Sequence, residues 1–275
     1  MEEFVEQLNN IGYKNVLSMK VNGYRKERLY FSAESPSGDK VFIKWLIKGD
    51  SIEKREISYE KLIGNVLGGK EYPLPPKYSE NCVISEFIDS VGDIKSVIKR
   101  ENVQVASDYI RSSIENYIRL LDQLNQQKVE CCNYGYLELI DIYSKRWAYY
   151  SKKSKCRKIM AYYAFVLYAR MLKVKSRRKV VPQKYVILGD LNSGNCLCLS
   201  DKTVKCIDYE KVCYSDPNID MANYIVKIRH HARNNVQLLQ GIDEAIEIFM
   251  KCKYYREDNY KFAYSVFDFI DKNWS

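Results

Sequence analysis

The sequence predicts an α+β fold with two lobes, a small β-rich N-terminal lobe and a larger α-helical C-terminal lobe. Strand-like runs separated by turn residues occupy roughly the first ninety residues. Beyond them, apolar residues recur at the spacing of helices. We expect the boundary after Phe87, so that residues 1–87 form the first lobe and residues 88–275 the second. A chain of 275 residues is long enough to build both lobes around hydrophobic cores.

The N-terminal lobe contains four predicted strands and one helix. The strands cover residues 16–21, 28–33, 40–46 and 82–87, and the helix covers about residues 52–67. Turn chemistry between the second and third strands is strong, because Ser35–Asp39 consists of serine, proline, glycine and aspartate. Gly68 and Gly69 are expected to end the helix.

Helices dominate the predicted C-terminal lobe. Apolar residues recur at helical spacing from Ala106 to Leu124, and a second long helix is expected over about residues 158–172. Two or three further helices are expected between Met221 and the C-terminus. Two short β-like runs, residues 185–188 and 204–207, lie between the helical segments.

The bulk composition argues against several classes of protein. The N-terminal segment is acidic and polar, unlike a secretory signal. The longest apolar stretch, residues 159–172, is too short and too polar to cross a bilayer. The nine cysteines follow neither a disulfide framework nor a zinc spacing, which favours free thiols in a reducing compartment. We therefore expect a cytoplasmic protein with no membrane span.

The net charge of +9 is concentrated in one block. Between Lys145 and Lys184 there are fourteen lysines or arginines and no acidic residue. Such a block can attract nucleic acid or an anionic ligand. It can equally be a solvated helix face followed by a basic loop, and we favour this interpretation because no nucleic-acid recognition motif accompanies the block.

Three polar side chains of the C-terminal lobe carry the predicted chemistry. Asp190 and Asn195 lie in the run Val186–Leu197, and Asp208 follows in Cys206–Glu210. A strand, a polar loop and a β-hairpin would bring all three to one place. An amide and a carboxylate suit a divalent cation that prefers oxygen ligands, and the remaining carboxylate can accept a proton from an attacking hydroxyl. Phosphoryl transfer requires these parts and one protein cation to hold the nucleotide phosphates.

These runs resemble the catalytic and metal-binding loops of the aminoglycoside phosphotransferase and choline kinase superfamily. The family pattern is His-Gly-Asp-x-x-x-x-Asn followed by Ile-Asp-aromatic-Glu, and Tyr214–Ala222 resembles its next stretch, Asp-Pro-x-x-Asp-hydrophobic-Ala. The resemblance implies a protein-kinase-like fold with ATP or GTP as the phosphate donor. It implies Asp190 as the catalytic base, Asn195 and Asp208 as ligands of Mg²⁺, and Asp220 as the residue that orders the catalytic loop.

A lysine in the N-terminal lobe fits the same family. Lys44 is a cation within the apolar run Val41–Trp45, where it could also be an edge-strand lysine that points to solvent. In the family, the lysine of this strand binds the nucleotide phosphates and pairs with a glutamate of the adjoining helix. We choose Glu60 as that partner, and Glu56, one turn earlier on the same face, is the alternative.

The run Val83–Ile88 resembles the hinge of the family, where adenine meets backbone groups. The resemblance implies that the Ser85 carbonyl and the Phe87 N–H make these contacts. An ordinary interdomain strand is the alternative.

Two features depart from the family pattern. Leu188 stands where the family usually has histidine. Because that histidine supports the loop and is not the base, we expect activity to survive. The segment Lys20–Glu27 offers one glycine, Gly23, so there is no glycine-rich phosphate loop.

The expected function is a small-molecule kinase that uses ATP or GTP with Mg²⁺ to phosphorylate a hydroxyl, as aminoglycoside phosphotransferases do. One alternative is a choline or amino-alcohol kinase, and another is a glycan or lipopolysaccharide-core sugar kinase. A catalytically silent kinase-like binding module is a further alternative, against which the retained Lys44, Asp190, Asn195 and Asp208 argue. The acceptor and the oligomeric state stay open at this point.

The acidic residues of one C-terminal helix bear on the acceptor. A polycationic acceptor would require a carboxylate-lined pocket, to which Asp243, Glu244 and Glu247 could contribute. Their spacing is also that of a solvated helix face, which is the interpretation we favour.

Overall fold

The computed structural model describes residues 1–19, 28–47, 51–127, 129–150 and 180–274. The predicted helix over residues 158–172, the segment Lys20–Glu27 and most of the basic block lie outside the described residues. None of the helices in the described ranges combines the length and the apolarity that crossing a bilayer requires.

Contacts divide the chain into two compact units. Unit 1 comprises Met1–Asp89 together with Asp208–Lys211, and unit 2 comprises Ser90–Ile207 and Val212–Ser275. The predicted division after Phe87 assigned residues 208–211 to the second lobe, whereas their contacts lie with the first unit.

Unit 1 is built on a four-stranded antiparallel sheet of order β1-β2-β3-β4. The strands are β1 (Lys14–Met19), β2 (Arg28–Glu34), β3 (Lys40–Leu46) and β4 (Cys82–Glu86). The predicted turn between β2 and β3 is confirmed: the Ser35 N–H donates to the Asp39 carbonyl, and Gly38 takes a positive φ of 84° that suits glycine. β1 and β4 are the two edge strands.

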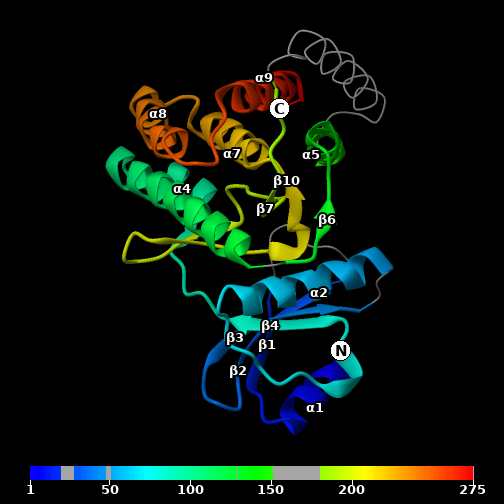
Figure 1. Cartoon of the computed structure of the whole chain (residues 1–275). Coiled ribbons are helices and arrows are strands. Elements are labelled where there is room, and N and C mark those ends of the chain that lie inside the picture. Colours follow the sequence, from blue (N-terminus) through cyan, green and yellow to red (C-terminus); the bar gives the residue numbers. More distant parts are fainter. Residues whose placement is uncertain (20–27, 48–50, 128, 151–179, 275) are drawn as a thin grey trace. The chain divides into compact units, whose positions relative to one another are not determined.

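Helices cover both faces of this sheet (Figure 1). On one face, α1 (Glu2–Asn10), a helix that the sequence did not predict, packs Phe4 and Leu8 onto the core. The other face receives α2 (Ser51–Val66), whose Ile57 packs against Leu46 and Val83. The predicted helix over residues 52–67 is thus confirmed. Gly68, with a positive φ of 77°, follows its end.

The described part of unit 1 also contains two single turns of 3₁₀-helix. One is η1 (Pro76–Tyr78), which precedes β4 and places Tyr78 in the core beside Phe4. The other is η2 (Tyr209–Lys211), which comes from the distant second half of the chain and packs against α2. Because η2 packs against α2, residues 208–211 belong to unit 1.

Unit 2 is mostly helical, as predicted. Within the described residues its helices are α3 (Ile94–Arg100), α4 (Val103–Gln126), α5 (Tyr136–Tyr150), α7 (Pro217–Ala232), α8 (Val236–Met250) and α9 (Glu257–Trp274). α4 packs against α8, and α7 packs against α9. Asn102, Asp216 and Asn235 cap α4, α7 and α8 by accepting backbone N–H groups of the first turn.

Two small sheets hold the loops of unit 2. In one, β10 (Cys213–Ser215) lies between β6 (Cys132–Asn133) and β7 (Tyr185–Ile187). In the other, β8 (Cys196–Cys198) lies between β5 (Gly92–Asp93) and β9 (Val204–Cys206). Residues 188–195 connect β7 to β8, so the loop that contains Asp190 and Asn195 is anchored at both ends by strands.

Candidate functional site

Lys44 is the centre of a cluster of charges in unit 1. It projects from β3 and is 5% exposed. Its Nζ donates to Glu60 Oε2 at 2.6 Å and to Asp208 Oδ1 at 2.9 Å, and Glu210 Oε2 lies 3.6 Å away. Burial alone would lower the pKa of the Lys44 ammonium, but Glu60, Asp208 and Glu210 raise it well above its ordinary value. Lys44 is therefore a fixed positive charge inside the unit.

The choice between Glu60 and Glu56 is resolved by the side-chain contacts. Glu60 is the residue that pairs with Lys44. Glu56, one turn earlier on α2, pairs instead with Arg28 at 3.0 Å and with Lys211. Helix α2 is thus held at two points, one turn apart, by different cations.

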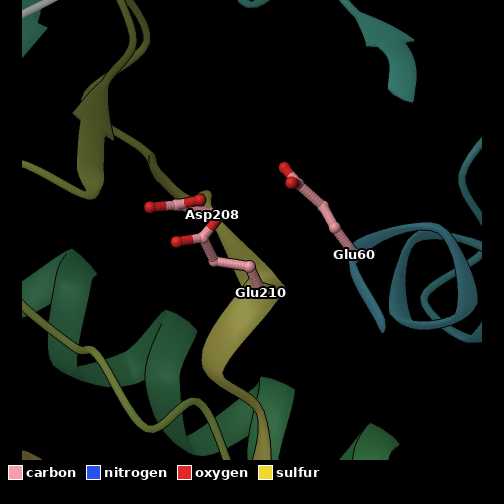
Figure 2. Close-up of side chains that lie close together, drawn as sticks. All are labelled: Glu60, Asp208 and Glu210. Carbon is pink, nitrogen blue, oxygen red and sulfur yellow. The ribbon is translucent and has the colours of Figure 1, made fainter. Parts of the chain in front are cut away.

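Three carboxylates converge around the Lys44 ammonium. In Figure 2, Glu60 reaches from α2 toward Asp208 and Glu210, which come from the segment that follows β9. One oxygen from each lies within 4.8 Å of the others, close enough to share a cation. The cation that they share here is the Lys44 ammonium. These three carboxylates therefore serve first as partners of the Lys44 ammonium, and a metal ion would require donors beyond them.

The predicted Mg²⁺ ligands have the chemistry that this ion requires. Mg²⁺ binds oxygen donors, and Asp208 supplies a carboxylate. In unit 2, Asn195 Nδ2 donates to the Asp190 carbonyl at 3.1 Å, so the oxygen of that amide is the atom with the chemistry of a metal ligand. The Ile207 N–H donates to the Asn195 carbonyl at 2.9 Å, and Asp208 is the next residue along the chain. The residues present fit a divalent cation with oxygen ligands.

Asp208 has a left-handed backbone, with φ of 67°. This region is unfavourable for residues other than glycine, although aspartate tolerates it better than most. Such a conformation persists when surrounding contacts hold it. The contacts of η2, which follows at once, supply that restraint.

Arg28 is a residue of this cluster that the sequence analysis missed. It opens β2 and is 3% exposed. Its two terminal nitrogens donate to Glu210 Oε2 at 2.6 Å and to Glu56 Oε2 at 3.0 Å. An arginine at the start of a strand gives no sequence signal for such a role, because its partner Glu210 lies 182 residues away.

The predicted catalytic loop of unit 2 is held by hydrogen bonds to its backbone. The Asp190 carbonyl accepts from Asn192 Nδ2 and from Asn195 Nδ2, each at 3.1 Å. Gly189, just before it, has a positive φ of 68° and donates its N–H to Asp220 Oδ2 at 3.0 Å. Because hydrogen bonds hold the backbone of this loop, the position from which the Asp190 side chain extends is fixed. A general base requires such positioning.

Asp220 lies fully buried beneath this loop, on α7. Besides Gly189, it accepts hydrogen bonds from the hydroxyls of Tyr117 and Tyr143. Burial is the largest influence and raises the pKa of Asp220 to about 6, although these hydrogen bonds oppose the shift. Its contact with Gly189 agrees with the expected role of ordering the loop. Leu188, which replaces the family histidine, is 4% exposed and packs as an ordinary core residue.

The hinge residues require a correction. The Phe87 N–H donates to the Lys40 carbonyl at 3.0 Å, so this group is used within the sheet. Because hydrogen-bonded pairs alternate along an antiparallel ladder, the same register turns the Ser85 carbonyl toward Phe42 of β3. The two backbone groups that the prediction names therefore face β3 and not the outer edge of the sheet. The backbone groups of Glu86 face the outer edge of β4 instead, because β4 is an edge strand.

An aromatic pair lies on the same face of the sheet as Lys44. Tyr30 is the cross-strand partner of Lys44, and its ring stacks on Phe42 with a centroid distance of 5.9 Å and an interplanar angle of 25°. The alternation of β2 and β3 could have revealed this pair, because Phe42 and Lys44 are two residues apart on one strand.

The acidic residues of α8 lie in ion pairs and hydrogen bonds of the helix surface. Asp243 pairs with Arg229, Glu247 pairs with Lys251 at 3.4 Å, and Glu244 accepts from Gln240. The Asp243 side chain is 59% exposed and that of Glu247 is 62% exposed. This arrangement agrees with a solvated helix face.

Comparison with known proteins finds similarity in structure only. No protein-family model and no curated protein sequence matches the chain. A choline kinase from Streptococcus pneumoniae is similar, with a TM-score of 0.62 and 12% identity over 99% of this chain and 88% of that one. An aminoglycoside phosphotransferase from Streptomyces rimosus, in complex with ADP and streptomycin, gives a TM-score of 0.61 and 12% identity over 98% of both chains.

A third similar structure is an aminoglycoside phosphotransferase in complex with GDP and kanamycin. Its TM-score is 0.59, with 13% identity over 98% of this chain and 88% of that one. At these identities the similarity establishes the architecture. The chain therefore has the protein-kinase-like fold that aminoglycoside phosphotransferases and choline kinases share.

Proposed function

We propose that this protein is a phosphotransferase that moves the γ-phosphate of ATP or GTP onto a hydroxyl of a small molecule, with Mg²⁺ as the cofactor. The observation that carries the proposal is the buried Lys44 ammonium, which Glu60 and Asp208 hold at hydrogen-bond distance. Burying a lysine among carboxylates is costly unless the arrangement is well paired. A fixed cation beside a carboxylate is what binding a metal-bound nucleotide requires.

The nucleotide would be held by groups of unit 1. Lys44 contacts its phosphates, and Phe42, with Tyr30 behind it, offers an aromatic surface to the base. The carbonyl of Glu86 lies on the outer edge of β4 and is the backbone group that we assign to the base in place of Ser85 and Phe87. Similar structures contain ADP and GDP, which supports a nucleotide ligand without deciding between adenine and guanine.

Asp208 and Asn195 would hold Mg²⁺ through their side-chain oxygens. When bound, this ion neutralises negative charge on the transferred phosphoryl group. Asn195 also holds the Asp190 carbonyl through its amide nitrogen, so one side chain couples the metal ligand to the catalytic loop.

Asp190 is the proposed general base. Its carboxylate orients the acceptor hydroxyl and takes its proton as the new O–P bond forms, while the bond between the γ-phosphorus and the β,γ-bridging oxygen breaks and ADP or GDP leaves. Hydrogen bonds from Asn192 and Asn195 fix the backbone of this residue, and Asp220 fixes that of Gly189 before it. The loop therefore has the rigidity that positioning a base requires.

The acceptor is a small molecule with a free hydroxyl. Aminoglycosides are favoured by the bound streptomycin and kanamycin of two similar structures, and amino alcohols by the similar choline kinase. The carboxylates of α8 lie on a solvated helix face, so they do not favour an aminoglycoside over the other acceptors. A screen of aminoglycosides, choline, ethanolamine and sugars with ATP and with GTP, read by ³¹P NMR of the product, tests the proposal.

The screen separates the proposed activity from a silent binding module. A phosphotransferase yields a phosphate ester with at least one acceptor class, and its formation stops when Mg²⁺ is chelated. Binding of Mg²⁺-nucleotide without ester formation and without nucleotide hydrolysis would favour the binding module instead.

A further inference from the structure

Arg28 stands at one end of a buried charge network whose other end is Asp208. Among the residues that the structure describes, the network contains three cations and four carboxylates, and all of them belong to unit 1. Its members are Arg28, Lys44, Lys211, Glu56, Glu60, Asp208 and Glu210. With all seven of these described groups ionised, their three positive and four negative charges sum to one negative charge, which favours the approach of a cation.

We propose that Arg28 is a positioning residue that fixes the orientation of the Asp208 carboxylate through Glu210. This inference rests on the proposed function, because it assigns Asp208 to the metal-bound nucleotide. Arg28 is not itself expected to contact nucleotide, since its two terminal nitrogens are bonded to Glu210 and Glu56.

The contact between Arg28 and Glu210 restrains both side chains. The distance of 2.6 Å is short for a charged hydrogen bond, and the side chains are 4% and 5% exposed. Screening by water and salt is weak at such exposure. The planar guanidinium holds Glu210 with one nitrogen and Glu56 with the other, so β2, α2 and η2 are joined by one side chain.

Asp208 depends on this contact because of its backbone. It precedes η2 directly, and its φ of 67° is a conformation that surrounding contacts must maintain. Glu210 lies two residues later and is 5% exposed, so it is a buried anchor within η2, the segment that follows Asp208. When Glu210 is released, the segment can relax to an ordinary backbone and turn the Asp208 carboxylate away from Lys44.

The two glutamates of α2 pair with different cations. Glu60 holds Lys44, whereas Glu56 holds Arg28 and Lys211. Loss of Arg28 leaves the pair between Lys44 and Glu60 in place. We therefore expect binding of the nucleotide itself to persist, and the additional affinity that Mg²⁺ confers to fall.

The test measures ADP affinity by calorimetry in excess Mg²⁺ and again in excess EDTA. The ratio of the two dissociation constants is the factor by which the metal tightens binding. Arg28→Met should reduce this factor about tenfold, the lower end of what residues supporting a metal ligand contribute. Arg28→Lys should recover part of it, because lysine keeps the charge but cannot hold both carboxylates in a planar fork.

Two further variants test whether Arg28 acts on Asp208 through Glu210. Glu210→Gln should lower the factor as Arg28→Met does, and the double variant should lower it no further, because both changes break the same contact. Ile63→Val is the matched control: it trims a buried residue of α2 that belongs to no ion pair, and the factor should stay at the wild-type value.

Circular dichroism identifies the variants that fold. If folded Arg28→Met keeps the full metal factor, the inference is wrong. If Arg28→Met does not fold, Arg28→Lys decides, and an unchanged factor in that variant also refutes the inference. Equal losses in Ile63→Val and Arg28→Met would show a general loosening of α2 and would equally overturn it. A wild-type protein whose ADP affinity ignores Mg²⁺ would refute the proposed metal-nucleotide function itself, and the inference with it.

Discussion

Replacing Asp220 by asparagine removes a buried titration from unit 2 and changes how the stability of that unit depends on pH. Asp220 is fully buried, and its pKa of about 6 lies above the ordinary value of 3.8. Burial is the main cause, and the nearby Asp190 carboxylate adds to it. The native state therefore holds this proton at pH values where the unfolded chain has released it.

The sign and the size of the change in the free energy of unfolding follow from the linkage between proton binding and folding. Because the unfolded chain binds fewer protons between pH 3.8 and 6, raising the pH through this window lowers the free energy of unfolding. The shift from 3.8 to about 6 is about two units, and each unit corresponds to about 1.4 kcal/mol, so the loss is about 3 kcal/mol. Below pH 3.8 and above pH 6 this residue contributes no slope.

Asparagine cannot titrate, although its amide oxygen can still accept the Gly189 N–H. Urea unfolding, followed by circular dichroism at pH values from 3.5 to 7, gives the free energy of unfolding of both proteins. The wild-type value minus the Asp220→Asn value should fall by about 3 kcal/mol across the window and level off above pH 6.

A control variant at the exposed Asp201 checks the sign. Hydrogen bonds from Thr203 lower the pKa of Asp201, so the difference between wild type and Asp201→Asn should slope in the opposite direction. A difference for Asp220→Asn that is flat or rises with pH would refute the burial argument.

The remaining predictions concern unit 1 and the basic block. Lys44→Met leaves Glu60 and Asp208 without their buried cation, so we expect a loss of about 3–5 kcal/mol in the free energy of unfolding, measured by urea titration; an unchanged value would contradict the buried pairing. Asp208→Ala should weaken nucleotide binding in Mg²⁺ and stop turnover, and identical calorimetric affinity in the variant would show that the metal assignment is wrong. The basic block should not bind nucleic acid, and sub-micromolar RNA or DNA binding at physiological salt, lost on neutralising Arg177–Lys179, would overturn this view.

Local patterns of the sequence were sufficient for much of the fold. The period of two in β2 and β3 and the helical period in α2 are properties of a few neighbouring residues, so they can be read without the tertiary structure. The pairing of Lys44 with Glu60 could be predicted for a similar reason, since a strand and the helix that follows it have few ways to pack. α1 was missed because its signal lies in nine mostly polar residues, of which Phe4 and Leu8 alone are buried.

The hinge shows what local patterns cannot decide. The residue types of β4 are compatible with either phase of the ladder, and a shift of one residue exchanges the groups that face β3 with those that face outward. The hydrogen bond from the Phe87 N–H to the Lys40 carbonyl settles the phase, and only the paired strand supplies it. The strand remains a predicted hinge, whereas the two backbone groups that the prediction named face β3.

The contact between Arg28 and Glu210 could not be predicted from the sequence, for a different reason. Glu210 was visible in the motif after Asp208, but nothing local connects it to an arginine 182 residues earlier. An arginine or lysine near the start of a strand usually points to solvent. Long-range ion pairs in a buried network depend on the whole fold, and no spacing rule predicts them.

The central claim is that Asp190 activates an acceptor hydroxyl for phosphoryl transfer. The most direct test is the turnover of Asp190→Asn with the acceptor found in the screen, compared with wild type and with Asp201→Asn as a matched surface control. Asparagine keeps the shape of the side chain and removes its basicity, so nucleotide affinity should be nearly unchanged while turnover falls by roughly 10²–10⁴-fold. Wild-type turnover in Asp190→Asn would contradict the proposed mechanism.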